Sequence, residues 1–137
     1  MKAYLDSSSF AKRFIEEAGS EKVEGVCAKA SELGLSVLCV PEIMSALNRR
    51  RRERTITNTQ YDAVKRRVVD DVRDADIVNV TPSVVASSIT ILETCPIRTL
   101  DALHVACALE WKADLFVSSD KQQLEGARRV GLKTRKV

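Results

Sequence analysis

The sequence predicts an α/β fold in which helices cover both faces of a mainly parallel sheet. Short apolar runs that suit buried strands alternate with longer segments whose apolar residues recur every three or four positions, as in amphipathic helices. This alternation is typical of parallel strands joined by helices. No internal repeat, low-complexity tract or linker interrupts it, and 45% of the 137 residues are hydrophobic, so we predict one domain over residues 1–137.

Two strands and three helices are predicted in the first half of the chain. Gly34 is expected to end the second helix, because glycine readily adopts the left-handed conformation that follows a helix. Pro41 suits the first position of the third helix, where no backbone hydrogen bond is lost. The predicted elements are a strand at 3–5, a short helix containing Phe10 and Phe14, a helix over 23–33, a strand over 35–40 and a helix from residue 41.

The second half continues the alternation. Thr57 and Asn58 are cap signals for a long amphipathic helix that begins beside them, and this helix could pair with the one from residue 41 as an arm. Thr99 is expected to be the N-cap of a later helix. The further predicted elements are a strand at 77–80, helices at 83–93 and 100–111, a strand at 115–117, a helix at 121–130 and a basic terminal strand.

Acidic residues lie at the boundaries of four predicted elements, where parallel α/β folds assemble ligand sites. Asp6 and Asp120 follow predicted strands, whereas Glu42 and Asp101 open predicted helices. Like charges ~4 Å apart repel by about 4 kcal/mol at an effective dielectric of ~20, and a divalent cation removes that repulsion. We interpret the four acids as a site for Mg²⁺ or Mn²⁺, because carboxylate oxygens are hard ligands and the sequence has neither paired histidines nor a spaced cysteine motif.

Each acid also has a purely structural interpretation. Asp101 and Glu42 could favour helix N-termini electrostatically, and Asp6 or Asp120 could cap the next helix. Asp101 argues most strongly for a site, because its helix is otherwise apolar apart from His104, and a charge on a buried helix needs a partner. His104 is interpreted as a core histidine with one satisfied hydrogen bond and is left out of the site.

Composition limits the other classes of protein. The chain has 22 Lys and Arg against 19 Asp and Glu, and the resulting charge of +3 permits a polyanionic partner without requiring one. Its four cysteines have no short-range pairing, so reduced, buried thiols are expected. No apolar run approaches the ~20 residues that cross a bilayer, and no signal peptide is recognisable, so we expect a soluble cytoplasmic protein.

Four segments together resemble the PIN-domain ribonucleases, particularly the VapC-like toxins. They are Tyr4-Leu5-Asp6-Ser7-Ser8, Pro41-Glu42, Arg98-Thr99-Leu100-Asp101-Ala102-Leu103-His104-Val105-Ala106 and Val117-Ser118-Ser119-Asp120, and the resemblance runs nearly end to end. It implies a PIN-like three-layer α/β/α sandwich, Mg²⁺- or Mn²⁺-dependent endoribonuclease activity, and an antitoxin that blocks a dimeric toxin. One departure is Lys121-Gln122-Gln123, which lacks the aromatic residue that often follows Asp120 in the family.

The chemistry of phosphodiester hydrolysis suggests a role for each acid. Asp6 and Asp101 are the expected direct metal ligands, and Asp120 would complete that site or hold a second ion. Glu42 would orient or deprotonate the attacking water. The number of ions stays open, and cleavage by metal-activated water would leave 5′-phosphate and 3′-hydroxyl ends.

Supporting roles are expected for polar and basic residues. Ser8 and Ser118 could hydrogen-bond a carboxylate or a phosphate in a second layer around the metal, or could serve only in turns. An arginine run could contact RNA phosphates, and its alternative is a solvated helix end. The candidate RNA-binding residues are Lys12, Arg13, Arg49, Arg50, Arg51 and Arg52.

Two other functions remain open from the sequence. A phosphoacceptor signalling domain also gathers carboxylates at strand ends, but it needs an adjacent acidic pair where Ser7-Ser8-Ser9 follows Asp6, and an aspartate where the chain has Val80-Thr81-Pro82. The other is a catalytically silent RNA-binding or antitoxin-titrating module, against which the intact acids argue. No motif indicates which RNA would be cut.

Overall fold

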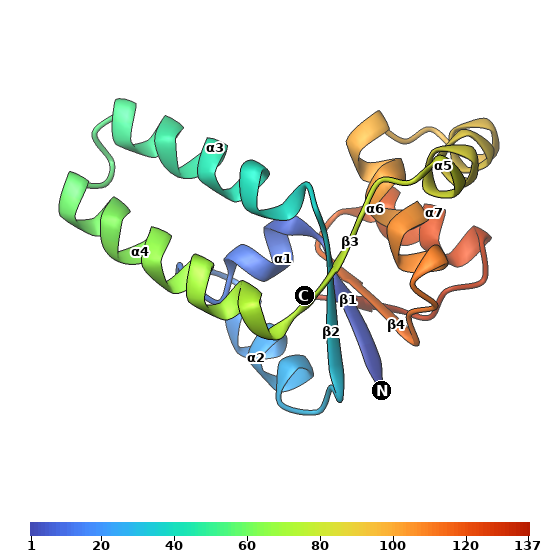
Figure 1. Ribbon diagram of the computed structural model, residues 1–137, viewed down its shortest axis with the longest axis horizontal. Helices are drawn as coiled ribbons and strands as arrows, with labels where there is room; N and C mark the ends of the chain where they lie inside the picture. The colour runs from blue at the N-terminus through green and yellow to red at the C-terminus, as the bar shows by residue number, and fades with distance from the viewer.

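The structure is a computed structural model that describes residues 1–137, and it is a three-layer α/β/α sandwich around a five-stranded parallel sheet (Figure 1). The strand order is β3-β2-β1-β4-β5, and every neighbouring pair is parallel. The strands are β1 (Lys2–Leu5), β2 (Glu32–Ser36), β3 (Asp76–Val78), β4 (Leu115–Ser118) and β5 (Thr134–Lys136). The predicted fold class is therefore confirmed.

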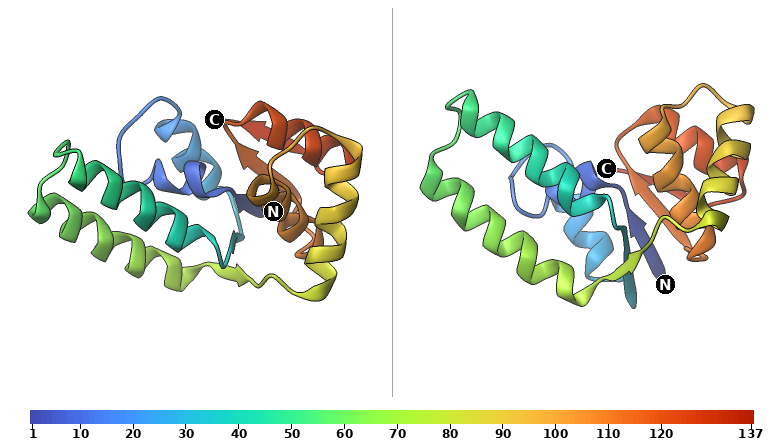
Figure 2. Two further views of the ribbon diagram at one scale, coloured as in Figure 1. Left: turned by 90° about the horizontal axis from the view of Figure 1, so that it is seen from above. Right: turned by 45° about the horizontal axis from the view of Figure 1, so that its top comes forward.

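Helices cover both faces of this sheet. On one face lie α1 (Ser7–Ala11), α2 (Ser20–Cys27), α3 (Cys39–Arg52) and α4 (Asn58–Asp71), which is followed by the short 3₁₀ turn η1 (Val72–Asp74). On the other lie α5 (Pro82–Thr94), α6 (Thr99–Glu110) and α7 (Lys121–Arg129). Figure 2 shows the same separation of the two helical layers from two further directions.

The central strand supplies side chains to both hydrophobic cores, because successive residues of a strand point to opposite faces. Ala3 and Leu5 of β1 pack in the core beneath α1 to α4, whereas Tyr4 packs in the core beneath α5 to α7. In β4, Val117 and Phe116 divide between the two cores in the same way. β1 and β4 are thus fixed from both sides, and this makes their carboxyl ends a rigid base for a site.

Helices α3 and α4 pack against each other as an arm that projects from the sheet (Figures 1 and 2). Within it, Asn48 donates from Nδ2 to the Tyr61 hydroxyl at 2.9 Å, and the Arg51 guanidinium lies 4.2 Å from the centre of the Tyr61 ring. Thr57 and Gln60 form a capping box at the start of α4. The expected pairing of these two helices is confirmed.

The boundaries predicted around Gly34 are wrong. Helix α2 ends at Cys27, β2 already contains Gly34, and α3 begins at Cys39 instead of Pro41. Gly34 faces the indole of Trp111, and a Cβ on it would lie 2.7 Å from ring carbons. This glycine permits close packing of α6 on the sheet and does not end a helix.

Smaller expectations concerned a helix cap and the cysteine thiols. Helix α6 starts at Thr99 itself, so the N-cap is Arg98, which makes no side-chain cap bond, and the expectation for Thr99 is wrong by one residue. All four cysteines are free, and three of them are buried, as expected. Every helix of the chain is too short or too polar to traverse a lipid bilayer.

Candidate active site

The four candidate acids all lie at the carboxyl-terminal edge of the sheet. Asp6 directly follows β1 and is the N-cap of α1, and Asp120 follows β4 by two residues and is the N-cap of α7. Glu42 and Asp101 lie in the first turns of α3 and α6. A role as a helix N-cap therefore does not exclude a role in a site for Asp6 or Asp120, because both helices begin at this edge of the sheet.

Asp6 is the most buried of the four acids, with 2% of its surface exposed. Its Oδ1 accepts a hydrogen bond from the Ser9 backbone N–H at 2.8 Å, and its Oδ2 accepts one from Ser118 Oγ at 2.8 Å. Burial raises the pKa of Asp6, and the hydrogen bonds from Ser9 and Ser118 offset part of that rise. The structure thus holds a carboxylate whose charge is only partly compensated by its neighbours.

Two polar side chains connect the aspartates into a chain of hydrogen bonds. Ser118 donates to Asp6 and also accepts from the Asp120 backbone N–H at 2.9 Å. Gln123 donates from its backbone N–H to Asp120 Oδ1 at 2.8 Å and from Nε2 to Asp101 Oδ1 at 2.9 Å. Asp101 also accepts from Arg98 Nε at 3.2 Å. The order of contacts is Asp6, Ser118, Asp120, Gln123, Asp101.

Glu42 approaches from the opposite helical layer. Its Oε1 accepts hydrogen bonds from Ser7 Oγ at 2.8 Å and from His104 Nε2 at 2.6 Å, whereas its Oε2 accepts none from the protein. Burial raises the pKa of Glu42, but the hydrogen bond and charge of His104, together with the Ser7 bond, outweigh it and leave the pKa lowered. Glu42 is therefore held as a carboxylate with one oxygen anchored.

His104 is more closely tied to the acids than the sequence predicted. It is buried in the core, as expected, but both ring nitrogens have partners, because Nδ1 lies 3.1 Å from the Tyr4 hydroxyl and Nε2 contacts Glu42. Burial raises the pKa of the Tyr4 hydroxyl well above its usual value, ahead of smaller effects from nearby thiols. The prediction of a core histidine is confirmed, and the prediction that it makes only one hydrogen bond is corrected.

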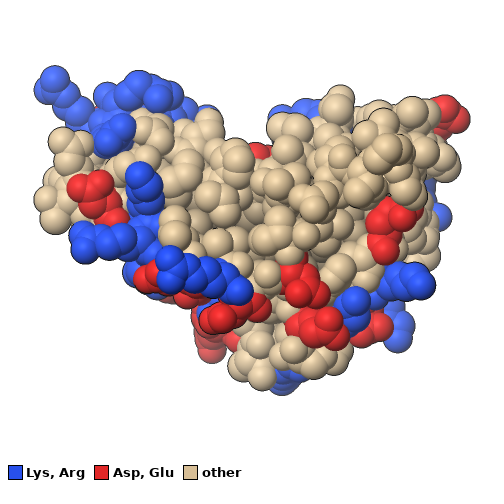
Figure 3. All heavy atoms as spheres, in the orientation of Figure 1, with Lys and Arg blue, Asp and Glu red and all other residues tan.

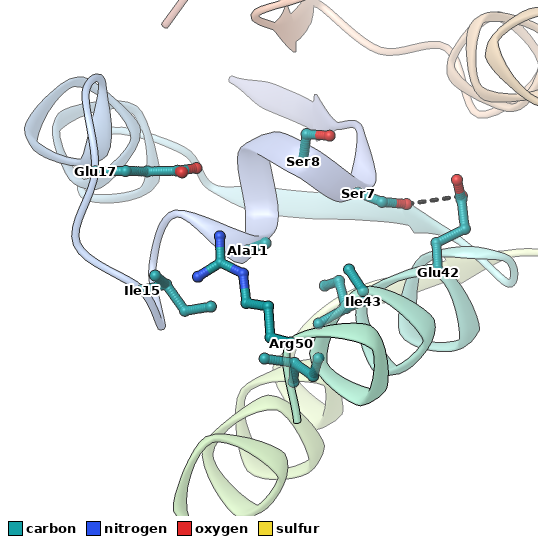
Figure 4. A pocket seen from close by; sticks show the side chains of 10 residues that line it. Ser7, Ser8, Ala11, Ile15, Glu17, Glu42, Ile43 and Arg50 are labelled. Atoms are coloured by element: carbon teal, nitrogen blue, oxygen red, sulfur yellow. Dashed lines mark hydrogen bonds between the residues drawn. The ribbon is translucent and has the colours of Figure 1, made fainter. Parts of the chain in front are cut away.

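A groove leads away from Glu42 between α1 and α3. It encloses about 290 Å³. Figure 4 shows Ser7 and Glu42 at one end and the Arg50 side chain extending toward α1 further along. Glu42, Ala46 and Arg50 are spaced by four residues on one helix, so the groove runs ~12 Å along α3. Ser8 is exposed and lines this groove without contacting an acid, and its neighbour Ser7 makes the carboxylate bond instead.

The candidate basic residues divide into two groups. Lys12 is buried and donates to the Ala18 carbonyl at 2.6 Å, and Arg13 forms ion pairs with Glu24 and Asp71. The other group lies on the outer part of α3, where Figure 3 shows Lys and Arg side chains gathered at the end of the arm. Arg49, Arg51 and Arg52 are exposed and Arg50 is half-buried in the groove.

The four acids offer oxygen donors to a metal ion. No three His, Cys, Asp or Glu side chains are close enough to form a ready-made metal cluster. The donors are nevertheless hard carboxylate oxygens, and Mg²⁺ usually keeps several waters and needs only one or two protein carboxylates. The only two buried side-chain polar atoms without a partner are Ser9 Oγ and Gln123 Oε1, both on residues that bind the acids. These residues fit a hydrated divalent cation.

The protein is thus an α/β protein with helices on both faces of a parallel sheet. Its candidate site is a group of acidic residues at the carboxyl edge of that sheet. A family model described as the PIN domain matches residues 3–129, and the chain belongs to this family. No curated protein matches the chain by sequence.

Solved structures share this fold at low sequence identity. The toxin VapC20 of Mycobacterium tuberculosis, described as cleaving the sarcin-ricin loop, has a TM-score of 0.71 at 14% identity and covers 98% of this chain and 99% of its own. FitAcB from Neisseria gonorrhoeae has a TM-score of 0.75 at 13% identity, and the match covers 96% of this chain and 95% of the FitAcB chain. VapBC2 from Rickettsia felis, bound to a promoter DNA fragment, has a TM-score of 0.70 at 10% identity. The match covers 100% of this chain and 99% of the VapBC2 chain.

Besides Arg98, which bonds Asp101, sequence reasoning missed three residues that contact the acids. Ser7, His104 and Gln123 each bond at least one of them. His104 carries a usable signal, because a residue three positions after Asp101 on a helix lies near the same face. Gln123 occupies the third helical position of α7, where a glutamine commonly reaches back toward the N-cap. Ser7 has no signal beyond adjacency to Asp6.

Proposed function

We propose that this protein is a metal-dependent endoribonuclease that hydrolyses RNA phosphodiester bonds and acts as the toxin of a toxin-antitoxin pair. The supporting observation is the coupling of Asp6, Asp101 and Asp120 by Ser118 and Gln123 at one sheet edge, in a chain of the PIN domain family. The toxin assignment is supported by the shared fold with VapC20 and with the VapBC and Fit complexes.

Mg²⁺ or Mn²⁺ would supply charge neutralisation at the phosphate and a water of lowered pKa. In this proposal Asp6 and Asp101 hold the ion, and Asp120 completes the same site or holds a second one. Glu42 orients the attacking water and accepts its proton at Oε2, the oxygen that no protein donor occupies. Ser118 keeps Asp6 in register by its 2.8 Å bond.

RNA would approach along the groove between α1 and α3. Arg50 lines the groove that begins at Glu42, and Arg49, Arg51 and Arg52 are exposed on the same helix. Guanidinium groups bind phosphate oxygens strongly, and such contacts release counterions, so binding would weaken steeply as salt rises. Lys12 and Arg13 already have protein partners, and Arg51 contacts Asn48 and Tyr61, which makes Arg49, Arg50 and Arg52 the better supported phosphate contacts.

An antitoxin is the proposed protein partner. The groove beside Glu42 is lined in part by Ile15, Ile43 and Leu47, so an apolar segment of a partner could fill it and cover the acid. The VapBC structures and a toxin-antitoxin complex from Klebsiella pneumoniae, which share this fold, support the assignment.

A homodimer is proposed through α5. Val85, Ile89 and Leu92 lie along one side of this helix, and each is more than a third exposed. Three apolar side chains at a four- and three-residue spacing form a continuous stripe that suits association. Ile89→Glu should turn a dimer into a monomer in light scattering, and an unchanged mass would exclude α5 as the interface.

The ribonuclease proposal is tested with total RNA and purified protein in Mn²⁺. Wild type should cleave, EDTA should abolish cleavage, and Asp6→Asn and Asp101→Asn should each lose at least ~100-fold in rate. Mapped products should carry 5′-phosphate and 3′-hydroxyl ends. Full cleavage in EDTA, or wild-type rates in both variants, would refute the mechanism.

A further inference from the structure

Glu42 is anchored on one oxygen by a buried hydrogen-bonding chain that the catalytic proposal does not use. His104 is 1% exposed and Tyr4 is fully buried, and they join β1 and α6 to Glu42 on α3. The distances are 3.1 Å from the Tyr4 hydroxyl to His104 Nδ1 and 2.6 Å from His104 Nε2 to Glu42 Oε1. Three separate elements therefore meet at one carboxylate.

The partners of the ring fix which nitrogen carries a proton. A carboxylate only accepts hydrogen bonds, so the 2.6 Å contact requires a proton on His104 Nε2. When the ring is neutral, the Tyr4 hydroxyl donates to the unprotonated Nδ1 and the single ring proton lies on Nε2. Tyr4 thus selects the tautomer that points an N–H at Glu42.

Packing holds Tyr4 in the orientation that this requires. Its ring is stacked on Phe116 with centroids 5.8 Å apart at 11°, and it meets His104 edge-on at 6.3 Å and 66°. A buried tyrosine packed on both sides has little freedom to turn its hydroxyl away. Glu42, by contrast, has a side chain 32% exposed and several rotatable bonds, so its position depends on what anchors it.

We propose that His104, with its tautomer set by Tyr4, is a positioning residue that fixes Glu42 Oε1 and so directs Oε2 toward the groove. The inference deepens the proposed ribonuclease function and rests on it for its catalytic consequence. Ser7 provides the second anchor on the same oxygen, at 2.8 Å. Residues that hold a catalytic carboxylate in this way commonly contribute 10–100-fold to activity.

The test compares His104→Leu with His104→Gln. Leucine removes the donor, whereas glutamine retains an N–H near the place of Nε2. His104→Leu should lower kcat for RNA cleavage by about 10- to 100-fold with KM nearly unchanged, and His104→Gln should recover most of that loss. Tyr4→Phe should give a smaller loss in kcat, because only the tautomer selection is removed.

Val105→Ala is the matched control, since Val105 is equally buried on α6 and its apolar side chain packs in the core beneath α5 to α7. It should lower the unfolding temperature without lowering kcat of the folded protein. If His104→Leu is folded and retains wild-type kcat, or if glutamine recovers nothing, the positioning role is refuted.

Crystal structures of the two His104 variants separate this inference from the ribonuclease proposal. Glu42 should keep its place beside Ser7 in His104→Gln and leave it in His104→Leu, whether or not RNA is the substrate. An unmoved Glu42 in His104→Leu would overturn the inference even in an active enzyme. A displaced Glu42 in a protein that cleaves no RNA would support the anchoring and refute only the proposed function.

Discussion

Ser118 Oγ lies 2.8 Å from Asp6 Oδ2 and so ties the carboxyl end of β4 to that of β1. The same hydroxyl accepts the Asp120 backbone N–H at 2.9 Å, so one small side chain serves two acids. We predict that Ser118→Ala destabilises the fold by about 1–3 kcal/mol, because a buried carboxylate and a backbone N–H both lose a partner. Urea unfolding measures the change, and cleavage assays should show a lower rate.

Ser119→Ala is the control for this variant. Ser119 is the next residue along and its hydroxyl donates to the Val137 carbonyl at 2.9 Å, away from the acids. It should leave the cleavage rate unchanged. Equal losses of activity in the two variants would show that Ser118 has no special relation to Asp6.

Asp6→Asn should unfold at a higher temperature than wild type at pH 7. Burial raises the pKa of Asp6 in the folded protein above its unfolded value, so stability is lost as the pH rises from the unfolded pKa to the folded pKa, and the loss is complete above the folded pKa. Asparagine keeps the N-cap without the charge. The gain should shrink as the pH falls through the folded pKa, and thermal melts from pH 3 to pH 8 would show it.

Mg²⁺ gives an independent check on the same variant. The ion should raise the melting temperature of wild type but not of Asp6→Asn, because a cation that binds only the folded state stabilises it. Asp62→Asn, at an exposed position on α4, should behave as wild type in both experiments. A neutral variant less stable than wild type at pH 7 would contradict the prediction.

Reversal of charge at Arg50 and Arg51 should weaken RNA binding. Arg50 lies in the groove, and Arg51 is the next, exposed residue of α3, so glutamate at both positions removes two of the proposed phosphate contacts and adds repulsion. KM should rise by at least ~10-fold and the slope of log affinity against log salt should become shallower by about 2. Lys22→Glu, at an exposed position on α2, is the control and should change neither quantity. An unaltered salt slope in the double variant would exclude these arginines as an RNA-binding surface.

Gly34→Ala should destabilise the fold by about 1–3 kcal/mol through overpacking. The new methyl group would lie 2.7 Å from Trp111, the chain's only tryptophan, and therefore the indole must shift. The emission of that tryptophan reports directly on the shift during urea unfolding. Gly25→Ala is the control, because nothing lies within 4 Å of a Cβ there.

The alternation of strands and helices and the position of the acids could be predicted from the sequence because both depend on local pattern. Asp6 and Asp120 follow apolar runs, and this alone places them at the same edge of a parallel sheet. Gly34 was misinterpreted because its constraint comes from Trp111, 77 positions later, and no local pattern contains that contact. The acids lie at the edge that the sequence predicted, and Ser118 bonds a carboxylate as expected, whereas the contacts of Ser7, His104 and Gln123 were not predicted.

The anchors depend on tertiary geometry. His104 contacts Glu42 across 62 positions and Ser118 contacts Asp6 across 112, so neither pairing has a local spacing to detect. Ser8 and Ser7 are equally good candidates in sequence, and only the rotation of α1 decides that Ser7 meets Glu42. The roles of the acids and of the arginines stay predictions until cleavage is measured.

Helix α3 sets the distance between the proposed general base, Glu42, and the proposed phosphate contact, Arg50. Glu42 and Arg50 lie eight residues apart on one continuous helix, so their separation is set by helical rise and not by any loop. One inserted residue between them would rotate Arg50 by ~100° out of the groove while leaving Glu42 in place. The distance between these two proposed substrate contacts is therefore fixed by a single helix.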